Sequence, residues 1–138
     1  MRPPEEEVRR LVREWIAKAD LDFDTAARLM AEERFRDVVA FHAQQAAEKY
    51  LKALLTRYQI EFPKTHVIKR LLILLEAVTP TVVDAIGDAN WLTPFGADIC
   101  YRGDRPDTMP GDEVRAHDLA KLVQDSVKAA LGEYLSTS

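Results

Sequence analysis

The chain has few of the residues that form covalent or metal cross-links. Cys100 is the only cysteine among 138 residues, so a disulfide within the chain and an all-cysteine metal site are both excluded. A single free cysteine suits a reducing compartment, and we expect a cytoplasmic protein. Cys100 itself is interpreted as a small buried residue rather than as a nucleophile.

Long hydrophobic runs are also absent. The longest unbroken aliphatic run covers residues 71–75, far short of the roughly 20 apolar residues that cross a bilayer as a helix. The first residues, with two prolines and three glutamates, lack the apolar core of a signal peptide. The sequence therefore predicts a protein that makes no contact with a membrane.

Neither sign of charge dominates the composition. The chain has 19 basic and 23 acidic residues and a net charge of −4, which argues against a general basic surface for nucleic acid but permits one local basic pocket. A hydrophobic share of 47% and a charged share of 30% are typical of a folded globular chain. The length predicts one domain over residues 1–138.

Most sequence motifs of catalysis are missing. There is no glycine-rich phosphate loop and no His-Glu-x-x-His pair. His42, His66 and His117 lie on three separate predicted helices, without metal-ligand spacing between any two. The serines have no nucleophile context. We therefore expect no metal and no cofactor.

What the sequence does contain is helical periodicity, and no stretch alternates as a half-buried strand does. Five helical stretches are predicted. The first three run from Pro4 to Met30, from Arg34 to Tyr58, and from His66 to Val78 with Thr65 as N-cap. A weak fourth stretch starts at Val82 and is broken near residues 90–93, where Gly87, Pro94 and Gly96 interrupt it, and the last runs from Asp112 to Tyr134. Residues 102–111 are predicted to form a loop. Short connections favour antiparallel neighbours, so we predict an all-α, antiparallel up-and-down bundle of four to five helices.

A polar stripe runs along the second predicted helix. His42, Gln45, Lys49 and Lys52 follow one another at intervals of three, four and three residues, which places them on one face beside an apolar stripe. Such a file can hold an anion or the edge of a base. The alternative is a solvated face on which Glu48 and Lys52 form an ordinary i,i+4 pair. His66, at a predicted helix start, is expected to bond nearby backbone or to pack.

A second polar group lies in the predicted loop before the last helix. Arg102 and Arg105 flank Gly103, so two guanidinium forks and an open backbone can approach a phosphate. Asp104 and Asp107 offset this charge, and a loop that pairs only with itself is the alternative.

These two places carry a family resemblance. The run Phe41–Leu55, with its sequence QQAAEKYLKALL from Gln44, resembles the second-helix signature of HEPN (Higher Eukaryotes and Prokaryotes Nucleotide-binding) domains. Pro63–His66 is similar to the entry of their third helix, the segment Tyr101–Pro106 to the loop before their last helix, and Ala17–Leu21 to their first helix. The resemblance has the right order and spacing over nearly the whole chain.

The resemblance implies an all-α bundle that forms a homodimer. In prokaryotes it implies a partner, a minimal nucleotidyltransferase, in a toxin–antitoxin-like pair. Together with the stripe and the loop it predicts a nucleotide-binding or interaction module, with nucleotide or RNA as ligand. The predicted ligand-binding residues are Gln45, Lys49, Tyr101, Arg102, Asp104 and Arg105, with His42 and His66 in support.

The alternative is a metal-independent ribonuclease toxin, since some HEPN domains carry an Arg-x(4–6)-His motif. Here Cys100 takes the place of the motif arginine in the loop, and no histidine follows Arg102 or Arg105 at the required spacing. Arg36 and His42 have that spacing, but within one helix they lie about 9 Å apart in height and about 120° apart in direction. The sequence therefore favours the binding module and leaves enzymatic activity open.

Overall fold

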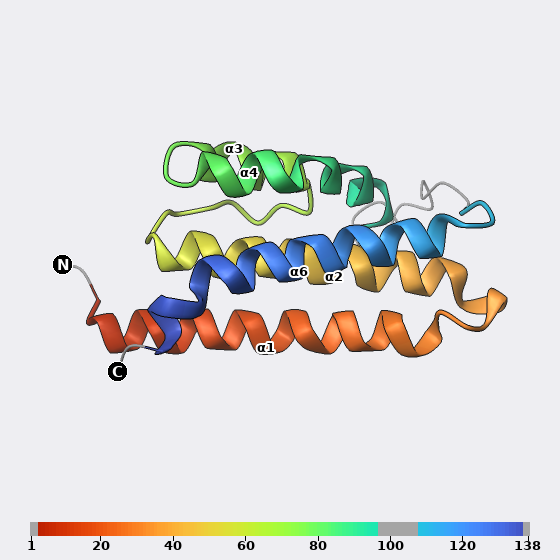
Figure 1. Cartoon of the computed structure of the whole chain (residues 1–138), viewed down its shortest axis with the longest axis horizontal. Helices are drawn as coiled ribbons and strands as arrows, with labels where there is room; N and C mark the ends of the chain where they lie inside the picture. Colours follow the sequence, from red (N-terminus) through yellow and green to blue (C-terminus); the bar gives the residue numbers. More distant parts are fainter. Residues whose placement is uncertain (1–2, 97–107, 137–138) are drawn as a thin grey trace.

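Three long helices form the body of the protein, and three shorter ones cover one side of it (Figure 1). The structure is a computed structural model that describes residues 3–96 and 108–136. The elements are α1 (Glu5–Leu29), η1 (Glu33–Phe35), α2 (Arg36–Arg57), α3 (Ile68–Glu76), α4 (Pro80–Ile86), η2 (Gly87–Phe95) and α6 (Asp112–Ser136), where η marks a 3₁₀ helix. Within the described ranges all regular structure is helical, which confirms the predicted all-α bundle.

The first helix begins where the sequence predicts. The carbonyl of Pro4 accepts hydrogen bonds from the amides of Glu7 and Val8, and three glutamates occupy the first turn, where the helix dipole favours negative charge. The predicted apolar stripe is buried at Val8, Val12, Ala19, Phe23 and Ala26, while Trp15 is half-buried. This stripe seats α1 along α2.

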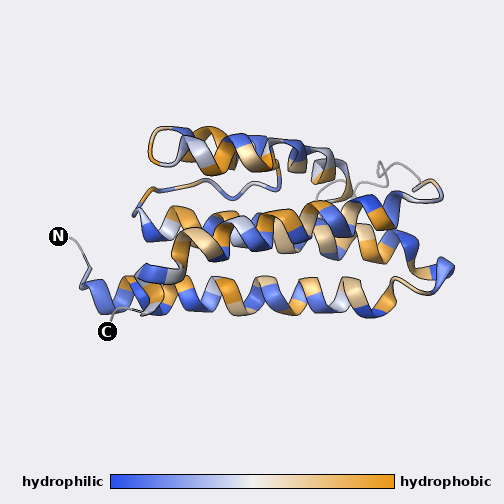
Figure 2. Cartoon of the chain, viewed as in Figure 1, coloured by the Kyte–Doolittle hydropathy of each residue, from blue (hydrophilic) through white to orange (hydrophobic). Residues whose placement is uncertain are grey.

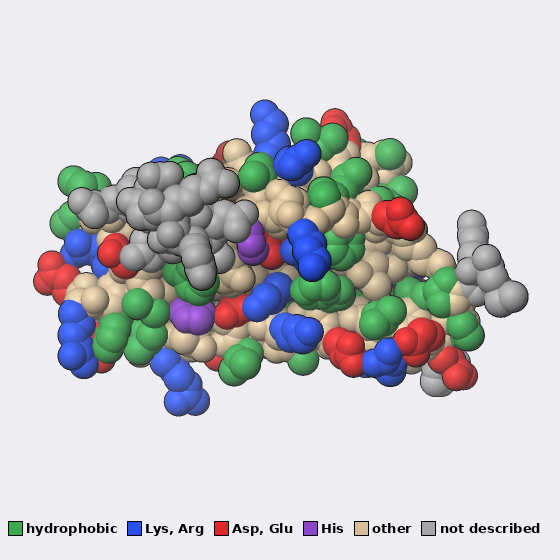
Figure 3. Space-filling view, turned by 180° about the vertical axis from the view of Figure 1, so that it is seen from behind, with side chains coloured by type: hydrophobic (Ala, Val, Ile, Leu, Met, Phe, Trp, Pro, Cys, Tyr) green, Lys and Arg blue, Asp and Glu red, His purple; other side chains and the backbone are tan. Residues whose placement is uncertain are grey.

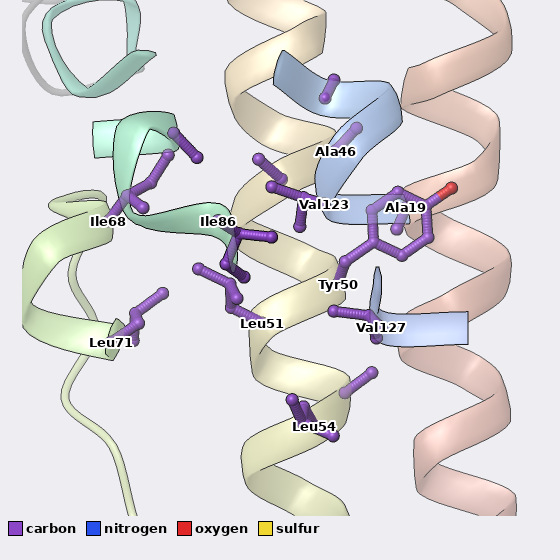
Figure 4. Close-up of a cluster of buried hydrophobic side chains, with 14 of the residues drawn as sticks. Ala19, Ala46, Tyr50, Leu51, Leu54, Ile68, Leu71, Ile86, Val123 and Val127 are labelled. Carbon is purple, nitrogen blue, oxygen red and sulfur yellow. The ribbon is translucent and has the colours of Figure 1, made fainter. Parts of the chain in front are cut away.

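The second helix is the centre of the bundle and has apolar neighbours on opposite sides. In Figure 4, Ala46 and Tyr50 point toward α1 and α6, while Leu51 points the other way, toward Ile86. Orange segments along α2 in Figure 2 accordingly occur on more than one side of the helix. Each fully buried leucine contributes about 1.5–3 kcal/mol. Because other elements cover α2 on several sides, polar residues between its two apolar faces become buried as well.

One connection departs from the predicted alternation of directions. The connection between α2 and α3, residues 58–67, runs back along α2, so α3 starts in the same direction as α2 (Figure 1). The connection brings His66 back beside the middle of α2, where Gln44 donates to the His66 backbone oxygen and Glu48 bonds the His66 ring. As a result, α2 and α6 run parallel: Arg36 pairs with Glu113 near their starts, and Arg57 lies over the ring of Tyr134 near their ends.

The third helix is capped by residues distant in sequence. Thr65 was predicted as its N-cap, but the Thr65 hydroxyl accepts from the amide of Val67, which precedes the helix. The first two helical amides are satisfied from η2 instead: Ile68 donates to Thr93 Oγ1 at 3.1 Å and Lys69 to Asn90 Oδ1 at 3.0 Å. The correction shows that α3 and η2 form a single hydrogen-bonded unit.

The predicted break in the fourth stretch is present, a few residues earlier than predicted. The α-helix α4 begins at Pro80, a residue that suits a first helical position, and ends at Ile86. From Gly87 the chain continues as the 3₁₀ helix η2, which contains Pro94.

Among the described residues, no helix is both long enough and apolar enough to cross a membrane.

Candidate functional site

The first polar cluster is centred on Glu48, in the middle of α2. One carboxylate oxygen bonds His66 Nδ1 at 2.6 Å, and the other bonds Lys52 Nζ at 2.9 Å. Gln44 adds a longer contact of 3.3 Å to the same carboxylate and donates to the backbone oxygen of His66 at 2.9 Å. The Glu48 side chain is only 4% exposed. We call His66, Glu48 and Lys52 the dry triad.

The cation of the dry triad is enclosed by aromatic rings. Lys52 Nζ lies 5.7 Å from the ring centres of both Trp15 and Phe62, and these rings contact each other edge to face. Such cation–π contacts partly replace the water that the ammonium group loses. The alternative interpretation, in which Glu48 and Lys52 form an ordinary pair on a solvated face, is wrong for this pair. The pair is buried because α1 and the 58–67 connection cover it.

A second cluster with the same plan is centred on Asp22 of α1. One carboxylate oxygen bonds His42 Nδ1 at 2.9 Å, and the other accepts from Lys49 Nζ. Burial works to raise the pKa of Asp22, but the hydrogen bonds from His42 and Lys49 outweigh it and hold that pKa below its ordinary value. The Asp22 side chain is 13% exposed and that of Lys49 is 24% exposed. We call His42, Asp22 and Lys49 the open triad.

The two triads fix the same ring nitrogen of each histidine. An ionised carboxylate can only accept, so Nδ1 carries the proton in both His42 and His66, and Nε2 of a neutral ring is then an acceptor. A histidine oriented in this way by a carboxylate is suited to move a proton or to bond a ligand through Nε2. Both triads are built on one stretch of α2, residues 42–52, and Figure 3 shows a face where histidine, acidic and basic side chains lie together.

The predicted ligand-binding residue Gln45 is tied to this network. Its side-chain amide donates to Gln44 Oε1 at 2.7 Å, and its side chain is half-buried. Lys49 and His42 belong to the open triad, and His66 to the dry triad. The expectation that His66 would bond nearby backbone is corrected: its ring reaches a carboxylate 18 positions earlier in the chain.

The remaining predicted ligand-binding residues, Tyr101, Arg102, Asp104 and Arg105, lie outside the described residues. The residues that flank this part of the chain are described, and both contact α2. At Gly96 a Cβ atom would lie 3.2 Å from the His66 Cβ and 3.3 Å from the Gln44 side chain. Thr108 donates a hydrogen bond to Asp37. The predicted participation of the four loop residues stays a prediction.

Sequence reasoning missed Gln44, Glu48 and Asp22. A signal for two of them was present, because Gln44, Glu48 and Lys52 repeat every four residues between positions that are buried apolar residues, such as Ala47 and Leu51. Asp22 had no such signal, since its partners come from a different helix.

A separate network links the three long helices. Tyr50 donates to Asp20 and accepts from Gln124 at 2.8 Å. Burial together with the Asp20 bond raises the pKa of the Tyr50 phenol.

Metal chemistry has no visible basis in the described part of the chain. Residues 3–96 and 108–136 contain no group of three or more histidine, cysteine or acidic side chains arranged to hold a metal ion. The charged groups of both triads instead satisfy one another.

Comparison with known proteins places the chain in a family. Neither a curated protein nor a solved structure matches it. A family model does match: the HEPN domain model covers residues 12–133, a range that contains both triads. The chain therefore belongs to the HEPN domain family, which supports a module of the nucleotide-interaction or ribonuclease type.

Proposed function

We propose that this HEPN domain binds a nucleotide or an RNA strand on the α2 face that carries the open triad. The observation that carries the proposal is the pair of triads, which holds two imidazoles in fixed orientations, His42 on α2 and His66 in the connection before α3. Imidazole nitrogens, an amide and an ammonium group are the donors and acceptors that bind phosphates and base edges. Gln45 and Lys49 are the contact residues, and His42 and His66 support them.

Lys49 is the residue whose change tests this proposal. Isothermal titration with nucleoside triphosphates should show binding, and Lys49→Ala should weaken it about tenfold through the loss of one charge-assisted hydrogen bond. Lys121→Ala is the matched control, because Lys121 also pairs with an aspartate but lies exposed on α6. Absence of heat with every nucleotide and with an RNA oligonucleotide, or equal weakening by both variants, would rule the proposal out.

We further propose that the domain acts as a homodimer beside a minimal nucleotidyltransferase, in a toxin–antitoxin-like pair. The resemblance of the sequence motifs implies this partner, and exposed apolar side chains on α6 support the dimer: Val114 is 51% exposed and Leu122 is 39% exposed. Because Val114 and Leu122 are eight positions apart on one helix, their side chains point about 80° apart around the helix axis. Sedimentation should give a dimer that Leu122→Glu dissociates, and co-expression should recover a complex with a nucleotidyltransferase encoded beside this chain.

A ribonuclease is the second candidate, and the oriented histidines favour it. A histidine with Nδ1 on a carboxylate can take the proton of a 2′-hydroxyl through Nε2. The Arg36–His42 spacing gives it no support: Arg36 bonds Glu113 and Glu33, while His42 bonds Asp22. Cleavage of RNA in the presence of a chelator should disappear in His42→Ala or His66→Ala and persist in His117→Ala. RNA that stays intact with the unaltered protein would exclude this candidate.

A further inference from the structure

A small cleft opens beside the dry triad, on the side of the molecule formed by the start of α3 and the end of η2. Its volume is about 230 Å³, below the roughly 300–1,000 Å³ of pockets for drug-sized ligands. It is lined by Lys64, Thr65, His66, Val67, Arg70, Thr93 and Gly96. The cleft therefore has room for a small group rather than for a whole nucleotide.

The charge of this cleft is of one sign. Lys64 and Arg70 are exposed, and neither has an ion-pair partner within the described residues. No carboxylate is among the described lining residues. Two unpaired cations beside one small cleft create an attractive field for an anion.

One hydroxyl group, that of Thr65, adds a directional donor to these cations, since the hydroxyl of Thr93 already donates to Asn90 Oδ1. Thr65 is buried, and its hydroxyl oxygen accepts from the Val67 amide, which leaves the hydroxyl proton to donate. The first amides of α3 do not contribute, because Thr93 and Asn90 occupy them. An anion in this cleft would therefore be bonded by side chains and not by a helix terminus.

We propose that this cleft binds a terminal phosphate group. A phosphate monoester carries about −1.5 to −2 charges near pH 7, which suits one lysine and one arginine, and a guanidinium can bond two of its oxygens at once. His66 lines the cleft and also belongs to the dry triad, so a ligand on the α2 face can place its terminal phosphate here. In that form the proposal rests on the proposed function, and it names a substrate class: nucleotides or RNA with a terminal phosphate.

Three matched RNA oligonucleotides test the substrate class: 5′-phosphorylated, 3′-phosphorylated and without a terminal phosphate. The unaltered protein should bind one of the phosphorylated forms about tenfold more tightly than the form without phosphate, as expected for charge-assisted hydrogen bonds. The double variant Lys64→Gln/Arg70→Gln should remove this preference and leave binding of the unphosphorylated RNA unchanged. Lys121→Gln/Arg34→Gln, two exposed changes elsewhere, should keep the preference. Equal binding of all three RNAs, or a preference that survives the cleft variant, would overturn the assignment of these substrates.

Inorganic pyrophosphate separates the cleft from the proposed function. In amide NMR spectra it should shift the signals of Thr65, His66 and Arg70 in the unaltered protein, and not in the cleft variant. This result, without any RNA binding, would uphold the cleft as a site for free phosphate anions and refute the nucleotide function. Spectra that do not change with pyrophosphate would overturn the cleft as a phosphate site. Circular dichroism of the cleft variant should match that of the unaltered protein, because both changed side chains are exposed.

Discussion

The two triads have the same plan and differ in exposure to water. In each, one carboxylate oxygen bonds a histidine Nδ1 and the other bonds a lysine ammonium group. Glu48 is 4% exposed and its lysine 10%, whereas Asp22 is 13% exposed and its lysine 24%. The dry triad joins α2 to the connection before α3, and the open triad joins α2 to α1.

From this difference in burial we infer that the two triads have different roles. Removing one partner of a buried ion pair strands the other charge and costs about 3–5 kcal/mol, whereas exposed pairs contribute about 0–1 kcal/mol. The dry triad therefore cannot release its lysine to a ligand at small cost. In the open triad, Lys49 can exchange its bond to Asp22 for a bond to a phosphate. The dry triad accordingly holds His66 in place, and the open triad is the one that we propose contacts the ligand.

The largest expected effect comes from Glu48→Gln. This change removes the negative charge that pairs with the Lys52 ammonium group, which lies between two aromatic rings. We therefore expect the free energy of unfolding in urea to fall by about 3 kcal/mol. Glu76→Gln, at an exposed position of α3, should change it by at most about 0.5 kcal/mol. A loss below about 1 kcal/mol in Glu48→Gln would show that the ion pair of the dry triad is no more strongly excluded from water than that of the open triad.

A smaller loss is expected when the dry triad is crowded from outside. In Gly96→Ala the new Cβ would press on the His66 Cβ and the Gln44 side chain, at a cost of about 1–2 kcal/mol. The backbone itself tolerates alanine, since φ is −73°. Gly87→Ala is the matched control, because nothing lies within 4 Å of its added Cβ. Equal stability of the two variants would contradict the close contact at Gly96.

In the open triad, Asp22→Asn should cost about 1 kcal/mol near neutral pH, where the carboxylate is ionised. The folded-state pKa of Asp22 lies below its ordinary value of 3.8, so its contribution is complete above about pH 4 and is lost as the pH falls through the lower folded pKa. The difference in unfolding free energy between the unaltered protein and the variant should therefore shrink in acid. A difference that stays constant from neutral pH to pH ~2 would contradict the lowered pKa.

The smallest effect is the response of each pair to salt. At about 1 M salt the screening length is about 3 Å, which weakens exposed pairs and leaves buried pairs nearly unchanged. In double-mutant cycles, the coupling of Asp22 with Lys49 should fall by a few tenths of a kcal/mol, and that of Glu48 with Lys52 should stay the same. The reverse order would refute the comparison.

Much of the fold could be predicted, because it depends on local patterns. The starts of α1 and α6 follow from Pro4 and Asp112, and both lie where the sequence places them. The parallel course of α2 and α6 could not be predicted. It depends on the 58–67 connection running back to the middle of α2, and no residue pattern in that segment predicts this.

The site was predicted in part, and burial explains the remainder. His42, Gln45, Lys49 and Lys52 could be chosen because a helical period places them on one face. The role of Glu48 could not, since what buries it lies on α1 and in the connection, at Trp15, Phe62 and His66. An i,i+4 pair has the same sequence pattern whether it lies in water or under two rings.

The capping of α3 by η2 has a consequence for how the molecule opens. A nine-residue helix is too short to persist alone in water, and two of its first amides depend on Thr93 and Asn90. When η2 detaches, α3 loses both its cap and its contacts with η2. We therefore expect α3, α4 and η2 to open as one cooperative unit on top of the three long helices. The amide protons of Ile68 and Lys69 should then exchange with solvent at the same rate as the other protected amides of these three elements.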